Sequence, residues 1–326
     1  MSEASEVVLG DELGRGGSAS VHAALWRGTP VAVKVWWVQP PFSLAARRGA
    51  AESSFLREVE ILSSLRHPNI LAVFALIKRP PMLVMELAAA GSLRDLLRRR
   101  TLAELPWTRR VDLLRGVAAG VEFLHAQQPP IFHMDLKSSN VVVSAEWVPK
   151  VCDLGIGVSS EKDFKARVGK SGTPRYMAPE CVNDGPVANL QAVDSYGFGW
   201  IVHDVSHVGT SPSAQRSADG ASPNAAAAPS ASSGGSNSEP TGNAVSPISP
   251  GDTLSGTDST PWIGVLVRRS MTKFAVETGE HVPLPLAQLI GACLAVDPEQ
   301  RPTLAAARER LAEAALKAPE WGATPT

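Results

Sequence analysis

Four polar residues in the middle of the chain have types and spacing suited to phosphate chemistry. Asp135 is followed by Lys137 two residues later and by Asn140 five residues later, just before an apolar run. An aspartate can orient a hydroxyl and accept its proton, a lysine can neutralise a phosphate in transfer, and an asparagine can bind Mg²⁺. Asp153 follows the next apolar run and suits a second Mg²⁺ ligand, since this ion takes few carboxylates together with phosphate oxygens. The pattern indicates phosphoryl transfer, although a structural turn could also use Asp and Asn.

A cluster of glycines near the start of the chain could bring the backbone close to a phosphate. Gly14, Gly16 and Gly17 lie between two runs of β-forming residues, and glycine permits close approach and unusual dihedral angles. An ordinary hairpin turn or a dinucleotide-binding fingerprint could show the same glycines. The fingerprint requires a helix directly after them. A second strand follows here and ends at residues 31–34, so the sequence favours a β-hairpin flap.

Lys34 lies within this otherwise apolar strand. It needs no partner if the strand lies at the surface, and this interpretation stays open. A buried lysine needs a negative partner. Glu58 and Glu60 both lie in residues 54–65, whose apolar side chains recur with helical spacing. Glu58 shares a side of that helix with the apolar residues, whereas Glu60 points elsewhere, so we prefer Glu58 as the partner.

The elements that must position these residues fall into two parts, which indicates the α+β class. Up to about residue 87 short β-forming runs surround one helical segment, and from Gly91 onward the apolar spacing is mostly helical. Residues 208–260 consist largely of Ser, Ala, Pro, Gly and Asn. Such a segment buries too little apolar surface to offset the entropy lost on ordering. We therefore expect a disordered insertion there.

The composition argues against several classes of protein. A formal net charge of -1 disfavours a general nucleic-acid binder. Cys152, Cys181 and Cys293 show no paired spacing and indicate neither a zinc site nor a disulfide framework. No apolar run approaches the roughly 20 residues that span a bilayer, and the first residues do not form a secretory signal. We expect a cytoplasmic protein without a membrane span.

Taken together, the motifs resemble the signature set of the protein kinases. The glycine loop, Lys34, the helix glutamate, HMDLKSSN at 133–140, DLG at 153–155 and GTPRYMAPE at 172–180 occur in family order. The resemblance runs from about residue 7 to 312. The segments FLREVEIL, GSLRDLL and GTPRYMAPE are most similar to the tyrosine-kinase-like group, whose members are mostly serine/threonine kinases. Lys137 and Thr173 match the serine/threonine form of these loops.

The resemblance implies a bilobal protein-kinase fold over residues 1–312. It consists of a small β-rich N-lobe with one helix at about 7–87 and a larger, mainly helical C-lobe at about 88–312, followed by a tail at 313–326. The implied function is a serine/threonine protein kinase that uses ATP and Mg²⁺ to phosphorylate a hydroxyl of a protein substrate. The 208–260 insertion, which carries four Ser-Pro pairs, could serve regulatory partners.

The resemblance also assigns roles to individual residues. Lys34 would hold the α- and β-phosphates of ATP and pair with Glu58. Asp135 would be the catalytic carboxylate, and Lys137 would steady the γ-phosphate. The implied Mg²⁺ ligands are Asn140 and Asp153. The residues implied to bind the nucleotide are Gly14, Gly16, Gly17, Val21, Ala32, Lys34, the gatekeeper Met85, Glu86 and Ala88 of the hinge, and Val142.

Three further residues are implied to have structural roles. Asp194 would anchor the catalytic loop, and Arg301 would form an ion pair with Glu180.

A pseudokinase that acts as a binding scaffold is the alternative function. It would explain why Met134 stands where the family usually has an arginine, but the implied ATP and metal ligands are all retained. A small-molecule phosphotransferase is disfavoured by the GTPRYMAPE segment, which positions peptides in the family.

Met134 leads to a prediction about regulation. In the family, the arginine at this position pairs with a phosphorylated residue of the activation loop, and methionine has no charge with which to bind a phosphate. We therefore predict that phosphatase treatment leaves the rate of phosphate transfer nearly unchanged, as does alanine substitution of Ser159, Ser160 and Ser171. Loss of transfer in both experiments would show that activation-loop phosphorylation controls the protein after all.

Overall fold

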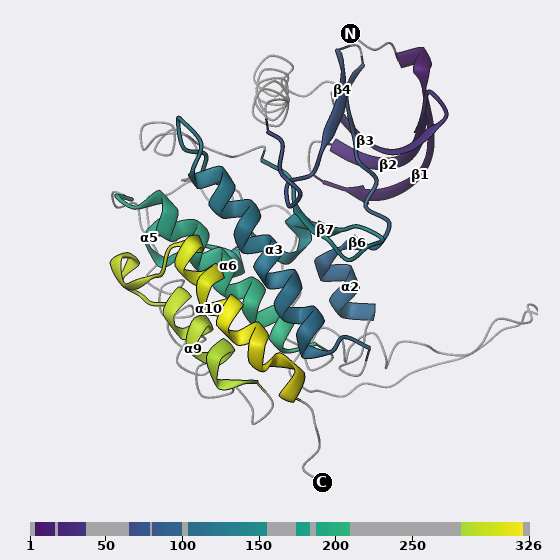
Figure 1. Cartoon of the computed structure of the whole chain (residues 1–326). Helices are drawn as coiled ribbons and strands as arrows, with labels where there is room; N and C mark the ends of the chain where they lie inside the picture. Colours follow the sequence, from purple (N-terminus) through teal and green to yellow (C-terminus); the bar gives the residue numbers. More distant parts are fainter. Residues whose placement is uncertain are drawn as a thin grey trace, which may run out of the picture.

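The computed structural model describes residues 4–16, 19–36, 65–78, 80–99, 104–154, 174–182, 187–208 and 282–321. These residues form a β-sheet part that contains the first strands and a larger, mainly helical part (Figure 1). Gly17, Glu58 with its expected helix at 54–65, and the three activation-loop serines lie outside the described residues. So does the expected insertion at 208–260, apart from Val208.

The first part of the fold is an antiparallel sheet with the strand order β1-β2-β3-β5-β4, and it curls strongly upon itself (Figure 1). The β2–β3 hairpin turns at Arg27 and Gly28, whose φ angles of 50° and 78° suit a tight two-residue turn. A short 3₁₀ helix, η1 (Ala4–Glu6), precedes the sheet. The strands are β1 (Val7–Arg15), β2 (Ala19–Trp26), β3 (Thr29–Trp36), β4 (Val73–Lys78) and β5 (Pro81–Met85).

The two faces of this sheet bury different sets of side chains. One face forms a small apolar cluster that includes Val31, Val33 and Val84. The other face carries the pairs Val21↔Lys34 and Ala23↔Ala32, since residues opposite each other across an antiparallel ladder share a face. This second face bears the residues expected to bind the nucleotide.

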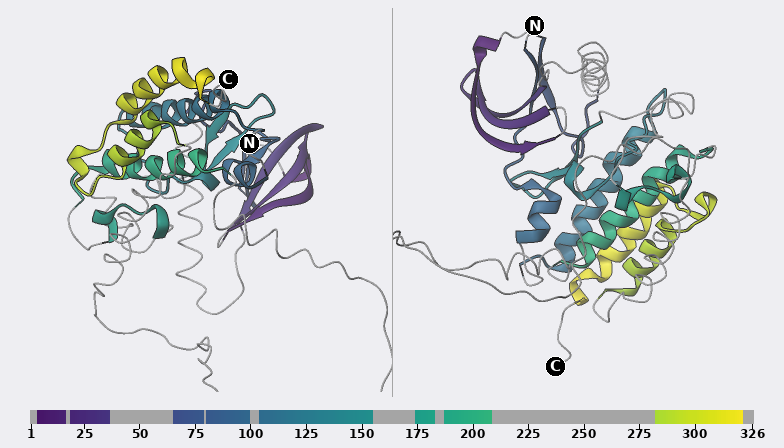
Figure 2. Two further views of the ribbon diagram at one scale, coloured as in Figure 1. Left: turned by 90° about the horizontal axis from the view of Figure 1, so that it is seen from below. Right: turned by 180° about the vertical axis from the view of Figure 1, so that it is seen from behind.

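The second part of the fold is built around α6 (Leu190–Ser206), which is buried along nearly its whole length. Helices α3 and α9 pack against it, and α10 packs against α3 (Figures 1 and 2). The last helix runs through residue 312 to Lys317. The other helices are α2 (Leu93–Arg99), α3 (Trp107–His125), α5 (Pro179–Val182), α9 (Leu284–Cys293) and α10 (Leu304–Lys317), with 3₁₀ turns η2 (Ser138–Asn140), η4 (Pro174–Tyr176), η5 (Pro298–Gln300) and η6 (Ala318–Glu320).

A second, small sheet lies where the two parts meet. It consists of β6 (Gly91–Ser92), β7 (Val141–Val143) and β8 (Pro149–Val151), in that order. The segment before β4 attaches to it, because the Leu71 amide donates to the Val151 carbonyl at 3.0 Å and the Val151 amide donates to the Asn69 carbonyl at 2.9 Å. His67 stacks on Phe123 of α3 with ring centroids 4.7 Å apart. The β-rich and helical parts are therefore joined through β8 and α3.

The expected α+β arrangement, with a β-rich N-lobe and a mainly helical C-lobe, is confirmed. In the described portion of the chain, no helix combines the length and the apolar character needed to cross a membrane.

Gly120 of α3 lets the segment before β4 approach the helix, and this gives a prediction. A Cβ atom at position 120 would lie 2.5 Å from the Asn69 carbonyl oxygen, a backbone atom that cannot rotate away. We expect Gly120→Ala to lower the free energy of unfolding by about 1–3 kcal/mol, measured by chemical denaturation. The matched control is Gly291→Ala in α9, where nothing lies within 4 Å of the added atom. That change should be neutral or stabilise by up to about 1 kcal/mol through helix propensity. Equal effects of the two changes would contradict the packing argument.

Candidate active site

The loop that carries Asp135 is anchored by a buried carboxylate of α6. Asp194 accepts hydrogen bonds from the His133 amide at 2.7 Å and from the Met134 amide at 2.8 Å. The side chain of His125, at the end of α3, also contacts Asp194 through Nε2 at 2.8 Å. Met134 adopts a left-handed conformation with φ of 66°, which costs a non-glycine residue free energy unless its surroundings hold it there. The bonds to Asp194 stabilise this conformation.

Asp194 is ionised at neutral pH. Burial alone would raise the pKa of its carboxyl, but the hydrogen bond and charge of His125 and the hydrogen bond from the Met134 amide outweigh burial and lower that pKa. The side chain of Met134 packs beside the apolar cluster that includes Ala178 and Tyr196. At position 134 the structure thus uses a backbone amide and an apolar side chain.

His133 connects the Asp135 loop to the segment that carries Asp153. Its Nδ1 accepts a hydrogen bond from the Asp135 amide at 3.3 Å, so the ring proton lies on Nε2 and is donated to the Cys152 carbonyl at 3.0 Å. The Cys152 amide in turn donates to the Asn140 carbonyl at 3.0 Å. These bonds hold the two segments side by side.

Asp135, Lys137 and Asn140 converge at the end of this loop. Lys137 Nζ forms a short ion pair with Asp135 Oδ2. Asn140 Nδ2 donates to the same oxygen at 3.1 Å and to the Asp135 carbonyl at 2.9 Å. The side chains of Asp135 and Lys137 are mostly buried. The three side chains expected to act together therefore lie together.

Lys34 reaches across from the sheet to Asp153. Its Nζ lies 3.0 Å from Asp153 Oδ1, with 15% of the lysine side chain and 47% of the aspartate side chain exposed. Partial burial would raise the pKa of the Asp153 carboxyl, but the charge of Lys34 and its hydrogen bond lower it. Asp153 has a φ of 64°, a second constrained conformation at this site. The expected partner of Lys34, Glu58, lies outside the described residues.

The donor set near Asp153 fits Mg²⁺ better than a metal held by protein ligands alone. The Cys152 amide, next to Asp153, donates to the Asn140 carbonyl at 3.0 Å, so the backbones at the two expected ligands lie close together. Their side chains offer one carboxylate and one neutral oxygen. Among the described residues, no cluster of three or more His, Cys, Asp or Glu side chains could hold a metal. A hard cation bound by few protein oxygens takes its remaining ligands from phosphates and water. Asp153 and Asn140 are therefore compatible with Mg²⁺ as expected ligands.

The residues expected to bind the nucleotide border this site from both parts of the fold. Val21 lies opposite Lys34 and Ala32 lies opposite Met85 in the large sheet, while Val142 lies on β7. Gly14 pairs with Val21, and the Gly16 amide donates to the Ala19 carbonyl at 2.8 Å, which closes the described side of the glycine turn.

The connection between the two parts begins at Glu86, directly after β5. The Glu86 amide donates to the Ala72 carbonyl at 2.9 Å, and the Ala88 carbonyl accepts from the Gly91 amide at 3.0 Å. The Glu86 side chain forms an ion pair with Lys150 of β8 at 3.0 Å, and Lys150 also donates to the Pro68 carbonyl at 3.1 Å. The sequence analysis missed this role of Lys150, because its partners lie 64 and 82 residues away.

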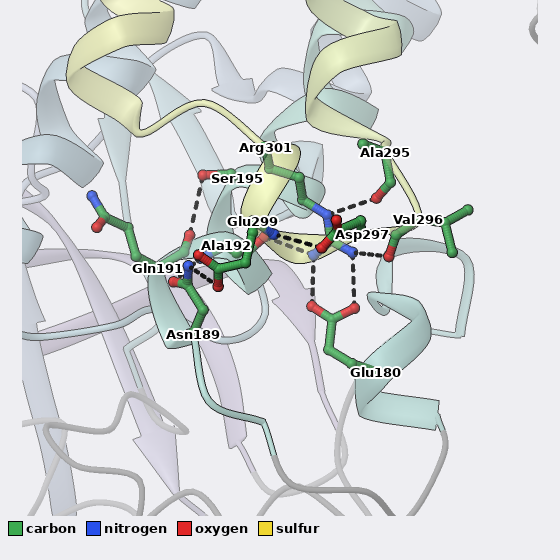
Figure 3. A network of polar contacts seen from close by, with 10 residues as sticks. All are labelled: Glu180, Asn189, Gln191, Ala192, Ser195, Ala295, Val296, Asp297, Glu299 and Arg301. Carbon is green, nitrogen blue, oxygen red and sulfur yellow. Dashed lines mark hydrogen bonds and ion pairs between the residues drawn. The ribbon is translucent and has the colours of Figure 1, made fainter.

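The expected pair of Glu180 and Arg301 forms and belongs to a network of polar contacts (Figure 3). The two Nη atoms of Arg301 lie 2.6 and 2.8 Å from the Glu180 carboxylate oxygens. The fully buried guanidinium also donates to the carbonyls of Ala192, Ala295 and Val296. This arrangement ties α5 to the start of α6 and to the segment after α9 (Figure 3).

A second missed residue, Asp204 of α6, joins the Asp135 loop to η4. Its carboxylate accepts from Tyr176 at 2.7 Å, from Ser138 at 2.9 Å and from Arg175 at 3.1 Å. Burial, followed by the nearby charge of Asp204, raises the pKa of the Tyr176 hydroxyl to about 12. No local spacing in the sequence brings these four residues together.

Comparisons with known proteins show what the chain is similar to. The family model described as "Protein kinase domain" matches residues 7–313. The chain is 38% identical over 198 residues to "Serine/threonine-protein kinase CTR1" of Arabidopsis thaliana, a match covering 60% of this chain and 23% of the relative. It is 31% identical over 206 residues to "Serine/threonine/tyrosine-protein kinase HT1" of the same organism, covering 63% of this chain and 51% of the relative. The matches thus span about half or less of each relative's length.

The anchoring role of Asp194 can be tested by removing its charge. Asp194→Asn keeps the shape but places an NH₂ group or a weaker acceptor against the two loop amides. We expect the free energy of unfolding at pH 7 to fall by about 2–4 kcal/mol. Because the folded-state pKa is lowered, this stabilisation is complete above the unfolded value near 4 and is lost as the pH falls through the folded value. The difference in the free energy of unfolding between wild type and Asp194→Asn should therefore narrow only below about pH 4.

The control for this measurement is Asp112→Asn, at an exposed aspartate of α3. This substitution should change the free energy of unfolding by less than about 0.5 kcal/mol, both at pH 7 and below pH 4. A gap for Asp194→Asn that stays constant down to pH 2 would contradict the electrostatic account.

Proposed function

This chain belongs to the protein kinase family, and from that membership and the site we propose that it is a serine/threonine protein kinase. It transfers the γ-phosphate of ATP to hydroxyl groups of protein substrates. The observation that carries the proposal is the convergence of Asp135, Lys137 and Asn140 at one end of the loop, facing a site bordered by the Lys34–Asp153 pair.

In the proposed mechanism, each of these side chains has a distinct task. Asp135 orients the substrate hydroxyl and accepts its proton, and Lys137 neutralises charge on the phosphate in transfer. Lys34 binds the α- and β-phosphates. Asn140 and Asp153 hold Mg²⁺, which supplies charge neutralisation at the phosphate oxygens. Positioning and electrostatic stabilisation account for the rate enhancement, and no covalent intermediate is needed.

The remaining expectations support a cytoplasmic protein that acts on other proteins. None of the three cysteines is in a disulfide bond, which fits a reducing compartment. The GTPRYMAPE segment, described from Pro174 onward, is fixed to the Asp135 loop through Tyr176 and Ser138. This link favours a peptide substrate placed beside Asp135. Residues 208–260 are a proposed contact region for regulatory partners.

The proposed activity is tested by phosphate transfer from Mg-ATP to a generic protein substrate. We expect wild type to label serine and threonine, and Asp135→Asn and Lys34→Met each to lower the rate at least about 100-fold. Asp112→Asn and Lys317→Met make the same substitutions at exposed positions, and both should keep the wild-type rate.

Nucleotide binding, measured separately, distinguishes the two candidate functions. Wild type that binds ATP but transfers no more phosphate than Asp135→Asn is a pseudokinase scaffold, which Met134 in place of the family's arginine would suit. Phosphotyrosine as the only product would contradict the serine/threonine assignment.

A further inference from the structure

We propose that Trp36 is a positioning residue for Lys34, whose indole face holds the lysine ammonium where the phosphates of the nucleotide bind. This inference rests on the phosphate-binding role of Lys34 in the proposed function. Trp36 belongs neither to the glycine loop nor to the hinge, and it is not one of the proposed metal ligands.

The first support is the geometry of the two side chains. Lys34 and Trp36 are two residues apart on β3, so both point to the same face of the sheet. Lys34 Nζ lies 4.9 Å from the centroid of the Trp36 ring. Trp36 is only 4% exposed. An ammonium within about 6 Å of an indole face is attracted by the ring quadrupole, most strongly where water is excluded.

The second support is that the indole itself is firmly held. Trp36 pairs with Ala19 across the β2–β3 ladder, two positions from the pair Val21↔Lys34 and on the same face of the sheet. Ala19 and Trp36 belong to the main core cluster together with Ala32 and Leu83. The small side chains of Ala19 and Ala32 leave room for the ring on this face. A ring fixed in this way restricts where the lysine side chain can go.

The third support is electrostatic. Lys34 also contacts Asp153, which the proposed function assigns to Mg²⁺. A carboxylate that binds a divalent cation has less charge left to attract a lysine. An indole is neutral and does not bind Mg²⁺, so its attraction for the ammonium is the same with and without the metal. Trp36 therefore suits the task of keeping Lys34 in place in both states.

A comparison of ATP with adenosine tests the inference. In the proposed function Lys34 contacts phosphates, which adenosine lacks. Loss of lysine positioning should therefore weaken the binding of ATP alone, whereas a general disruption of the site should weaken the binding of both ligands. We expect Trp36→Leu to raise the dissociation constant of ATP, measured by calorimetry in EDTA, about 3- to 10-fold. The dissociation constant of adenosine should change less than about 2-fold. Trp36→Phe retains an aromatic face and should recover most of the ATP affinity.

Two controls separate positioning from general packing. Trp107→Leu removes an indole from the helical part, where it packs against Arg110 and Trp321. It should lower the melting temperature without changing the preference for ATP over adenosine. If Trp36→Leu does not fold, Trp36→Met replaces it as the variant that fills the space without a ring.

The outcomes distinguish this inference from the proposed function. If Lys34→Met loses the preference for ATP while Trp36→Leu and Trp36→Met keep it, Trp36 is a packing residue and the inference is wrong, although the role of Lys34 stands. If ATP and adenosine lose affinity equally in the Trp36 variants, the inference is also wrong. If wild type itself shows no preference for ATP, the phosphate-binding role of Lys34 fails, and the inference fails with it.

Discussion

The carboxylate of Asp194 accepts hydrogen bonds from two successive loop amides, and the conformation of the whole Asp135 loop depends on this contact. Met134, whose amide is the second of these donors, has a left-handed φ of 66°, and the contact with Asp194 helps to hold the loop in this conformation. A buried ionised group is unfavourable unless it is fully hydrogen-bonded. The loop therefore stabilises the carboxylate while the carboxylate shapes the loop, and neither is stable in this form without the other.

The effect of this anchor reaches the proposed metal ligands through the backbone. His133 bonds to the Cys152 carbonyl, and the Cys152 amide bonds to the Asn140 carbonyl, so hydrogen bonds hold the Asp135 loop against the segment at Asp153. Of the contacts described above for this site, the ion pair between Lys34 and Asp153 is the one that joins these segments to the large sheet. Catalytic positioning in such a site is a property of a few hydrogen bonds between short segments and of one cross-lobe ion pair.

Much of the fold and part of the site could be predicted from the sequence. The spacing of Asp135, Lys137 and Asn140 is local, so their convergence follows from a single turn. The contacts of Lys34 with Asp153 and of Lys150 with Glu86 join residues 119 and 64 positions apart, and no periodicity reports such distances. Met134 shows a different limit. Its side chain indicated a lost charge, but the anchor uses its amide, which every residue except proline carries.

Among the described residues, two sets of contacts that join the β-rich part to the helical part differ in strength. In the first set, backbone hydrogen bonds join the segment at Leu71 to β8, and the mostly buried Lys150–Glu86 ion pair reinforces them. The second set includes the Lys34–Asp153 ion pair, whose aspartate is nearly half exposed, and an exposed ion pair contributes roughly 0–1 kcal/mol. This ion pair is the weaker of these described contacts. Dissolved salt, which screens exposed charges, therefore weakens the contact at Asp153 more than the hydrogen-bonded contact at β8.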